Sequence, residues 1–269
     1  MKTVTVIADD FGLASGINRG IVDCAKEGLI QGTAMLMNAP ATEEALSLLP
    51  QLNKVQVGLH LSIVEGFCLS RKASLQSEDE YFPGAPCLHL NWKRFIKLFL
   101  SGKIDLKDLE EEFEAQASAF VKKIGPIPFL NGTQHLHMLP GVLPLVLDLC
   151  RRYKIPRMRV TRVSMAEMMF TRKRALGAAF LDVCHALDRG QLKGIEDFGT
   201  TYGVTMTGDM DERFMDFVVE RSRREKIELV AHPGYNDEEF RKMSRENYQH
   251  MNWEKELNSL RYLKGKLHG

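Results

Sequence analysis

This sequence lacks the features that mark several classes of protein. Its 36 basic and 35 acidic side chains give a formal net charge of +1, which indicates neither a nucleic-acid surface nor an acidic tail. No apolar run is long enough to cross a bilayer, and the apolar run at the start is interrupted by two aspartates, unlike a signal peptide. We therefore expect a cytoplasmic protein with no transmembrane segment and no nucleic-acid partner.

The cysteines are few, and their spacing does not indicate a framework of disulfides. There are five, scattered along the chain, and no Cys-x-x-Cys motif is present. Cys24, Cys150 and Cys184 fall in apolar patterns of helical period, which indicates small core residues. An odd number of scattered cysteines is typical of a protein in a reducing compartment.

The opening run, residues 3–12, carries the strongest signal. Apolar and β-branched residues, typical of a strand buried on both faces, lead directly into Asp9 and Asp10. Functional groups of α/β proteins gather where parallel strands end, and buried carboxylates need a metal, an arginine or a hydrogen-bond network. Because adjacent strand residues point to opposite sides, we expect the two aspartates to take different roles. The alternative, a turn with two solvated aspartates, fits the buried run less well.

Strand-like and helical patterns alternate along the whole chain. The alternation occurs seven or eight times without a change of composition, which predicts one α/β domain over residues 1–269. We expect a single barrel of the (β/α) type, similar to a TIM barrel, with mainly parallel strands. The expected strands cover residues 3–12, 32–38, 55–62, 128–141, 157–162, 194–208 and 227–235. The expected helices begin near Ser15, as N-cap, and then cover residues 42–49, 92–100, 106–123, 142–153, 172–187, 211–224 and 237–267.

A long stretch without periodicity interrupts this alternation at residues 65–91. It mixes glycine, proline, serine and charged residues with aromatic ones, and it directly follows the strand that carries His60. A loop of this length in a compact domain is usually a lid, a binding loop or a disordered segment. We interpret residues 65–91 as a lid or substrate-binding loop.

Four of the expected strands end in residues that could carry chemistry. Besides the aspartate pair these are His60, the pair His135 and His137, and His232. In a barrel such ends meet at one mouth, and a carboxylate with two imidazoles suits Zn²⁺ or another divalent metal. A lone histidine at a strand end is more often structural, but the coincidence of several favours a site. On a strand, His135 and His137 would share one face and both could point into the mouth.

Four motifs in these positions resemble the YdjC/ChbG family of carbohydrate deacetylases. They are ADDFG at residues 8–12, GLHL at 58–61, NGTQHLHMLP at 131–140 and AHPG at 231–234. The amino-acid sequence around residues 64–66 and 131–132 is most similar to the hopanoid-associated branch called HpnK. The resemblance implies a distorted (β/α) barrel and metal-assisted removal of the acetyl group from an N-acetylated amino sugar.

The resemblance also implies one divalent metal ion, Mg²⁺ or Zn²⁺, held by Asp10, His60 and a histidine of the His-rich strand. The family pattern there is roughly D-[SG]-H-x-H-x-H, and its first histidine is the expected ligand. This chain departs from the pattern, because Asn131 stands at the aspartate position and Thr133 at the first histidine. His135 lies further along and could substitute. Alternatively, two residues and water hold the metal, or it binds weakly.

Amide hydrolysis assigns roles to the remaining residues. Asp9 is the general base that the resemblance implies, and His232 is our candidate acid for the departing amine. Arg159 or Arg162, at another strand end, is the expected partner that orients Asp9 by charge-assisted hydrogen bonds. Either arginine could instead face solvent or pair with a helix. We expect the substrate to contact two residues of the His-rich strand, His137 and Thr133.

The expected substrate is a small molecule or oligosaccharide, either a chito-oligosaccharide or a lipid-linked glycan. Two other functions stay open. The chain could be a degenerate member that binds a sugar without cleaving it, or a metal-dependent amidohydrolase acting on a non-sugar amide. The position of the His-x-His pair counts against the second, because in those barrels the pair ends the first strand and here it lies in mid-chain. A homodimer is an open expectation for the assembly.

Overall fold

The apolar runs of the sequence form one parallel sheet. The computed structural model describes residues 3–79, 82–88, 92–171, 175–188, 190–237 and 251–268. Its sheet has six strands in the order β6-β3-β2-β1-β8-β7, and every neighbouring pair is parallel. The strands are β1 (Val4–Phe11), β2 (Gly32–Met35), β3 (Gln56–Leu61), β6 (Leu130–Gly132), β7 (Thr200–Tyr202) and β8 (Ile227–Ala231).

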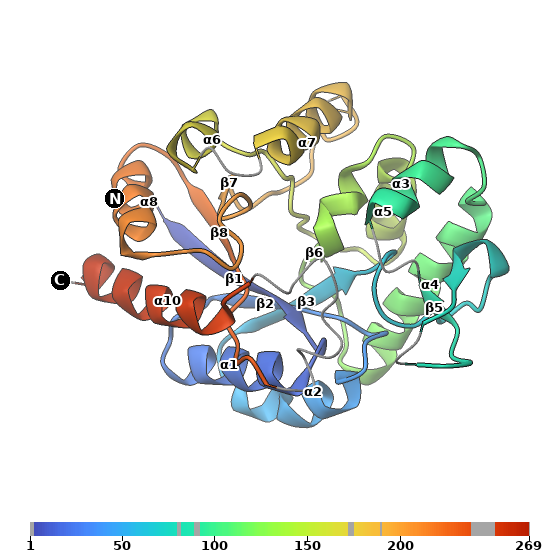
Figure 1. Ribbon diagram of the computed structural model, residues 1–269, viewed down its shortest axis with the longest axis horizontal. Helices are drawn as coiled ribbons and strands as arrows, with labels where there is room; N and C mark the ends of the chain where they lie inside the picture. The colour runs from blue at the N-terminus through green and yellow to red at the C-terminus, as the bar shows by residue number, and fades with distance from the viewer. Residues whose placement is uncertain are drawn as a thin grey trace.

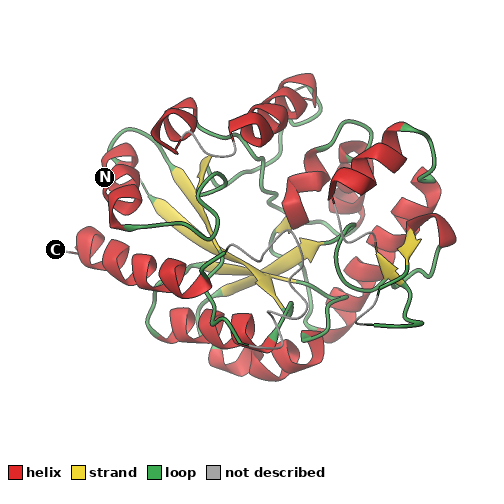
Figure 2. Ribbon diagram, in the orientation of Figure 1, coloured by secondary structure: helices red, strands yellow, loops and turns green. Residues whose placement is uncertain are grey.

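Helices surround this sheet, as Figures 1 and 2 show. They are α1 (Ser15–Lys26), α2 (Thr42–Leu48), α3 (Trp92–Leu100), α4 (Leu106–Lys123), α5 (Leu143–Arg152), α6 (Met165–Thr171), α7 (Ala175–Asp188), α8 (Glu212–Ser222) and α10 (Trp253–His268). Three 3₁₀ turns are also present: η1 (Leu49–Gln51), η2 (Ala73–Leu75) and η3 (Thr133–Met138). Within the described ranges no helix has the length and apolar character needed to span a membrane.

Two expected helix starts need comment. The predicted N-cap at Ser15 is wrong, because α1 already includes Ser15 and the preceding residue, Ala14, has no side chain that could cap it. The expected helices at 172–187 and 237–267 correspond to α7 and α10, but residues 172–174 and 238–250 lie outside the described residues. All five cysteines are free and buried, and these include the three that the sequence places in the core, Cys24, Cys150 and Cys184.

The sheet is curled into part of a barrel, with six strands rather than the expected seven or eight. The strand expected at 157–162 forms only isolated parallel bridges. Met158 pairs with Leu130 on one side, while Arg157 pairs with Glu196 and Val163 with Thr201 on the other. Because each bridge is a single pair, no continuous ladder forms along the segment. The expected strand at 194–208 is reduced to β7. The segment nevertheless lies between β6 and β7 and connects the two edges of the sheet.

Strand periodicity stacks two layers of side chains inside the curl. The lower layer is a small apolar cluster of Ile7, Ala34, Phe129 and Phe198, separate from the main core between sheet and helices. Gly58 leaves space for this layer, because a Cβ there would collide with the ring of Phe129. Side chains two residues further along a strand point the same way, so the upper layer holds polar residues from the same strands.

The expected lid at residues 65–91 is partly tied to α4. It contains β4 (Gln76–Ser77) and β5 (Cys87–Leu88), which pair antiparallel, while residues 80–81 and 89–91 lie outside the described part. The buried carboxylate of Glu112 accepts the Ser70 N–H at 2.8 Å. Neighbouring Gln116 accepts the Ser62 N–H at 2.9 Å. Whether the loop opens or contacts substrate stays a prediction.

Candidate functional site

Both aspartates of the opening run reach the same site at the end of β1. Asp10 has a left-handed backbone, with φ of 69°, and the pairing of β1 with β2 shifts register between Ala8 and Phe11. Such a conformation is uncommon for residues other than glycine, though aspartate is among those that tolerate it. The irregularity breaks the simple alternation of sides. Asp9 and Asp10 are both buried and both contact residues of the polar layer.

Asp9 is bound by a buried arginine. Arg159 donates from Nη1 to Asp9 Oδ2 and from Nη2 to Asp9 Oδ1, the latter at 3.0 Å. Its Nε donates to Glu228 Oε1 at 2.7 Å, so one guanidinium lies between two carboxyl groups. Burial alone would raise the pKa of Asp9, but the charges of Arg159 and His60 outweigh it and hold that pKa well below its usual range. Burial raises the pKa of Glu228.

The alternative arginine does not take this place. Arg162 is about half-exposed and donates to Asp197 Oδ2 at 2.9 Å, on the outer side of the segment. Of the two candidates the sequence left open, Arg159 is therefore the one that contacts Asp9.

Asp10 faces His60, the histidine of the GLHL motif. His60 Nε2 lies 3.1 Å from Asp10 Oδ1, and its Nδ1 lies 2.6 Å from Asn131 Oδ1. The amide nitrogen of Asn131 donates to Asp9 Oδ1 at 2.9 Å. Burial by itself lowers the pKa of His60, but the hydrogen bond to Asp10 and the nearby charge of Asp9 raise it. Asn131 thus connects the two aspartates through His60.

The expected strand at 128–141 ends at Gly132, and η3 follows it. Inside η3, Gln134 and His135 have left-handed backbones, with φ of 50° and 56°. The prediction that His135 and His137 share a strand face is therefore wrong. Their ring centroids are 6.5 Å apart, and His135 Nδ1 lies 3.2 Å from Thr161 Oγ1. Burial, followed by the charge of Arg159, places the pKa of His135 well below its usual value.

The two residues expected to contact substrate, Thr133 and His137, form contacts with other residues of the chain. Thr133 Oγ1 lies 3.3 Å from Ser62 Oγ, and the side chain is buried. His137 Nε2 donates to the Arg159 carbonyl at 3.0 Å. Burial, with Arg159 and His60 nearby, lowers the pKa of His137 to about 4, so its ring is neutral at neutral pH. Substrate contacts for Thr133 and His137 stay predictions.

His232, just beyond β8, reaches the site from the opposite side. Its backbone N–H donates to Glu256 Oε2 at 2.6 Å, while its Nδ1 lies 3.8 Å from the same oxygen, too far for a hydrogen bond. The ring packs against Trp253 of α10. Burial alone would lower its pKa, but the buried charge of Glu256, with Asp10 and Asp9 beyond, raises it to about 9. His232 is therefore cationic at neutral pH.

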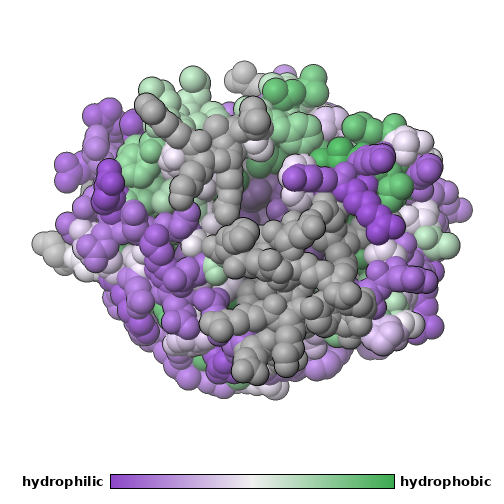
Figure 3. All heavy atoms as spheres, in the orientation of Figure 1, coloured by the Kyte–Doolittle hydropathy of each residue, from purple (hydrophilic) through white to green (hydrophobic). Residues whose placement is uncertain are grey.

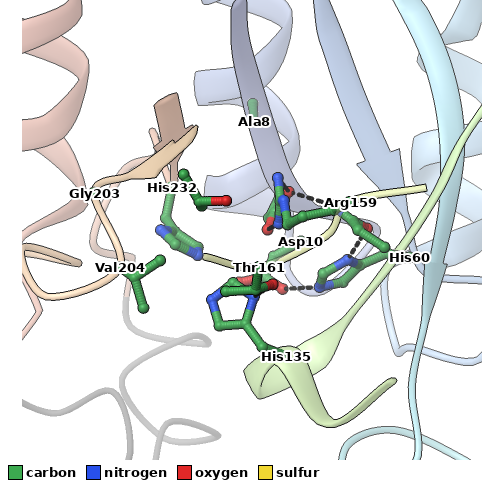
Figure 4. A network of polar contacts seen from close by, with 12 residues as sticks. Ala8, Asp10, His60, His135, Arg159, Thr161, Gly203, Val204 and His232 are labelled. Carbon is green, nitrogen blue, oxygen red and sulfur yellow. Dashed lines mark hydrogen bonds and ion pairs between the residues drawn. The ribbon is translucent and has the colours of Figure 1, made fainter. Parts of the chain in front are cut away.

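Figure 4 shows how these residues converge: the imidazoles of His60, His135 and His232 lie around Asp10, with Thr161 beside His135. A divalent metal would find an oxygen donor and a nitrogen donor already adjacent in Asp10 and His60. Across the described ranges, however, no three His, Cys, Asp or Glu side chains are close enough together to hold an ion. Asp10 and His60 could therefore supply two ligands for one metal ion. Ligation by His135 as a third would require its ring to move away from Thr161.

Asn131, Glu228 and Glu256 belong to the network but were not among the predicted site residues. Asn131 was noted only as a departure from a motif, although it lies within β6 directly opposite His60 of β3. Glu228 sits within the last strand, where a lone carboxylate in an apolar run was an available signal of burial beside a cation. Glu256 comes from α10, and no local pattern connects it with His232.

The chain matches one protein family over nearly its whole length, and it is similar in sequence to proteins of known name. The sequence profile of a family described as YdjC-like protein matches residues 3–263. The chain is 28% identical to a chitooligosaccharide deacetylase of Enterobacter sp. (strain 638) over 242 residues, 90% of this chain and 85% of that protein. It is 30% identical to a carbohydrate deacetylase of Danio rerio over 161 residues, 58% of this chain and 49% of that protein. The match thus spans about half the length of the fish relative.

A solved structure shares the fold. A crystal structure described as that of a cellobiose-phosphate cleavage protein of Enterococcus faecalis V583 superposes with a TM-score of 0.73. The superposition covers 99% of this chain and 94% of that one, at 17% sequence identity. Identity this low bears on the fold alone, and it supports the curled, barrel-like α/β architecture.

Proposed function

This chain belongs to the YdjC-like family, and from that premise we propose that it is a hydrolase that removes the acetyl group from an N-acetylated amino sugar. The names of the Enterobacter and Danio relatives support the reaction and the class of substrate. One observation within the chain carries the proposal. An ionised carboxylate, Asp9, lies beside the adjacent oxygen and nitrogen donors of Asp10 and His60, at the end of a barrel strand.

We propose that the site holds one divalent metal ion through Asp10 and His60, with His135 as third ligand. An imidazole nitrogen favours Zn²⁺ or its neighbours, whereas Mg²⁺ prefers oxygen donors. When bound, the metal would polarise the acetamide carbonyl and stabilise the oxyanion that develops on it. Thr133 does not offer a comparable ligand, because its hydroxyl is turned toward Ser62.

Asp9 is the proposed general base. Two arginine nitrogens and the Asn131 amide hold its carboxylate in one orientation, which suits the removal of a proton from an attacking water. A low pKa keeps the group ionised, but it also makes the carboxylate a weak proton acceptor. The share of the rate that depends on Asp9 is therefore the decisive quantity.

His232 is the proposed general acid. Hydrolysis of an acetamide expels an amine, which must gain a proton as the C–N bond breaks. Because Glu256 raises the pKa of His232 to about 9, the imidazole carries that proton at neutral pH. Asp9, which is ionised, and His232, which is protonated, would thus divide the acceptance and the donation of protons between them.

An exposed apolar surface favours a lipid-linked sugar as the substrate, and we propose this as the finer assignment. The surface, which we call the α6–α7 face, consists of Met165, Met169, Phe170, Phe180, Val183 and Leu187. Figure 3 shows green side chains gathered over α6 and α7. The inner side of α7 packs through Leu181 against the cluster that Val204 joins, and Val204 faces the site beside His232. Membership of the hopanoid-associated branch stays a prediction.

The test combines metal analysis with acetate release. Purified protein is assayed on N-acetylglucosamine oligomers and on N-acetylglucosaminyl lipids, and then as the variant Asp9→Asn. We expect Asp9→Asn to keep its metal and to lose about a hundredfold or more in rate, because it removes proton acceptance without removing bulk. Asp197→Asn, which alters the exposed pair with Arg162, is the matched control and should retain activity.

Other outcomes would identify the alternatives. Sugar binding without acetate release by the metal-loaded parent would show a degenerate, non-catalytic member. Release only from non-sugar amides would show an amidohydrolase of different specificity. An unchanged rate in Asp9→Asn would make Asp9 structural.

A further inference from the structure

Asn131 is a buried amide whose two ends contact two different functional groups. Only 1% of its surface is exposed. Its Nδ2 donates to Asp9 Oδ1 at 2.9 Å, and its Oδ1 lies 2.6 Å from His60 Nδ1. Asn131 therefore stands between the proposed base and a proposed metal ligand without being either.

Asp9 determines which way the amide of Asn131 points. Arg159 donates to both oxygens of Asp9, so Asp9 is held as a carboxylate, which only accepts hydrogen bonds. The NH₂ end of Asn131 must then face Asp9. The opposite orientation would place an amide oxygen against a carboxylate oxygen, two acceptors with no hydrogen between them, at a cost of about 1–3 kcal/mol.

The orientation of Asn131 in turn determines which nitrogen of His60 carries hydrogen. An amide oxygen can only accept, so the His60 nitrogen that faces it, Nδ1, must be protonated. The other nitrogen, Nε2, is the one that lies 3.1 Å from Asp10. When one ring nitrogen of a histidine binds a metal, the other ring nitrogen carries the hydrogen and donates it to a neighbouring acceptor.

We propose that Asn131 is a positioning residue that fixes the Nδ1–H form of His60 and so presents Nε2 beside Asp10 as a metal ligand, while it also orients Asp9. The inference rests on the proposed metal ligation by Asp10 and His60. An aspartate at position 131 could accept from His60 in the same way. It could not donate to Asp9, and it would bring two carboxylates together. The asparagine is thus the side chain that serves both neighbours.

Two variants separate the two contacts. Asn131→Asp keeps an acceptor for His60 and loses the donor to Asp9, whereas Asn131→Leu loses both at similar size. The first readout is the NMR signal of the His60 Nδ1–H, recorded on both the metal-free and the zinc-loaded protein and assigned with His60→Gln. The second is zinc affinity, measured by competition with a chelator. The third is acetate release.

We expect the His60 Nδ1–H to be protected from exchange in the parent and in Asn131→Asp, and to be lost in Asn131→Leu. Zinc affinity should fall about 10- to 100-fold in Asn131→Leu, the range found for lost partners of metal-binding histidines, and stay at least as tight as the parent in Asn131→Asp. Acetate release should fall in both variants. Asn18→Leu, which removes an equally buried amide from α1, is the control for lost stability and should keep the signal.

Several outcomes would overturn the inference. These are a protected Nδ1–H in Asn131→Leu, its loss in Asn131→Asp, or equal loss of zinc affinity in both variants. Because Asn131→Asp is diagnostic by itself, the test survives if Asn131→Leu fails to fold. The signal in metal-free protein does not depend on catalysis, so absent acetate release from the parent would count against the proposed function and not against the role of Asn131.

Discussion

At the scale of single residues, the charge of His232 depends on a helix that comes later in the chain. Glu256 of α10 is fully buried and uses its carboxylate to accept the N–H groups of His232 and Gly208. Among the described residues no lysine or arginine pairs with this carboxylate, and a buried carboxylate of that kind favours a proton on the nearest imidazole. The folded state therefore binds a proton at His232 more tightly than an unfolded chain does.

This linkage predicts that stability falls with rising pH. The pKa of His232 is raised from 6.5 to about 9, so its contribution is fully present below pH 6.5 and is lost as pH rises through 9. At 1.36 kcal/mol per unit of pKa, the loss is on the order of 3 kcal/mol. We expect urea denaturation to show this decline in the parent and a flatter profile in His232→Gln. His185→Gln, on α7, should keep the parental slope, and equal slopes in all three would contradict the assignment.

The sequence indicated which residues form the site, but it could not indicate where their side chains point. The sequence predicted Asp10, His60 and His232 at strand ends, and all three converge (Figure 4). It also predicted different roles for Asp9 and Asp10, but strand alternation alone would send them to opposite sides, whereas both reach the same site. The shifted register of β1 and the left-handed backbone of Asp10 are tertiary features, and no glycine or asparagine at that position announces them.

At the scale of elements, η3 decides whether the chain has a third metal ligand. Thr133→His places an imidazole at the family's usual ligand position, and His135→Ala removes the proposed substitute. If His135 is the working ligand, His135→Ala lowers metal affinity and Thr133→His has no effect or weakens binding. If Thr133 occupies the empty ligand position, Thr133→His raises affinity and His135 becomes dispensable. Isothermal titration with Zn²⁺ on both single variants and the double variant distinguishes these cases, since ligands of one ion are non-additive.

Controls for that experiment come from the same element. His137→Gln alters an imidazole that bonds the Arg159 carbonyl, so it should affect stability more than metal affinity. If every variant binds metal like the parent, neither Thr133 nor His135 is a ligand.

The conformation of η3 is also where sequence reasoning fails for elements. The apolar run through Phe129 and Leu130 predicts a strand correctly, but that strand stops at Gly132. Gln134 and His135 then adopt left-handed backbones without the glycine or asparagine that usually signals such a turn. A strand pattern and a 3₁₀ turn with alternate apolar residues look alike over so short a stretch.

The glycine of GLHL has a packing role that a double variant can test. A methyl group at Gly58 would collide with the Phe129 ring in the lower layer of the barrel. Gly58→Ala should therefore destabilise the protein by about 1–3 kcal/mol, as overpacked cores do. Phe129→Leu should recover part of that loss in the double variant, measured by thermal or urea denaturation. Strictly additive effects would show that the two positions do not share the space.

At the scale of the whole molecule, alternation of strands and helices predicted the α/β barrel class and the convergence of strand ends. It overestimated the number of strands in the sheet. A segment such as 157–163 has a strand-like sequence whether or not both neighbouring strands pair with it in register. The polar layer above the Phe129 cluster follows from strand periodicity, which the sequence contains. Its long-range members, Glu228 and Glu256, depend on how distant segments meet.

The α6–α7 face makes a prediction about the whole molecule and its substrate. Met165, Met169 and Leu187 are 72%, 74% and 70% exposed, which is costly unless the surface meets something apolar. If that partner is the lipid of a lipid-linked sugar, replacing all three with glutamine should lower acetate release from N-acetylglucosaminyl lipid in vesicles by about tenfold or more, since each buried apolar side chain contributes about 1.5–3 kcal/mol. Release from a soluble oligomer should stay within about twofold, because the site itself is untouched. Leu100→Gln is the control, since Leu100 is 79% exposed on α3, outside this face. Equal losses on both substrates would contradict the lipid assignment, and conversion of a dimer to a monomer in the triple variant would show instead that the face joins two copies of the chain.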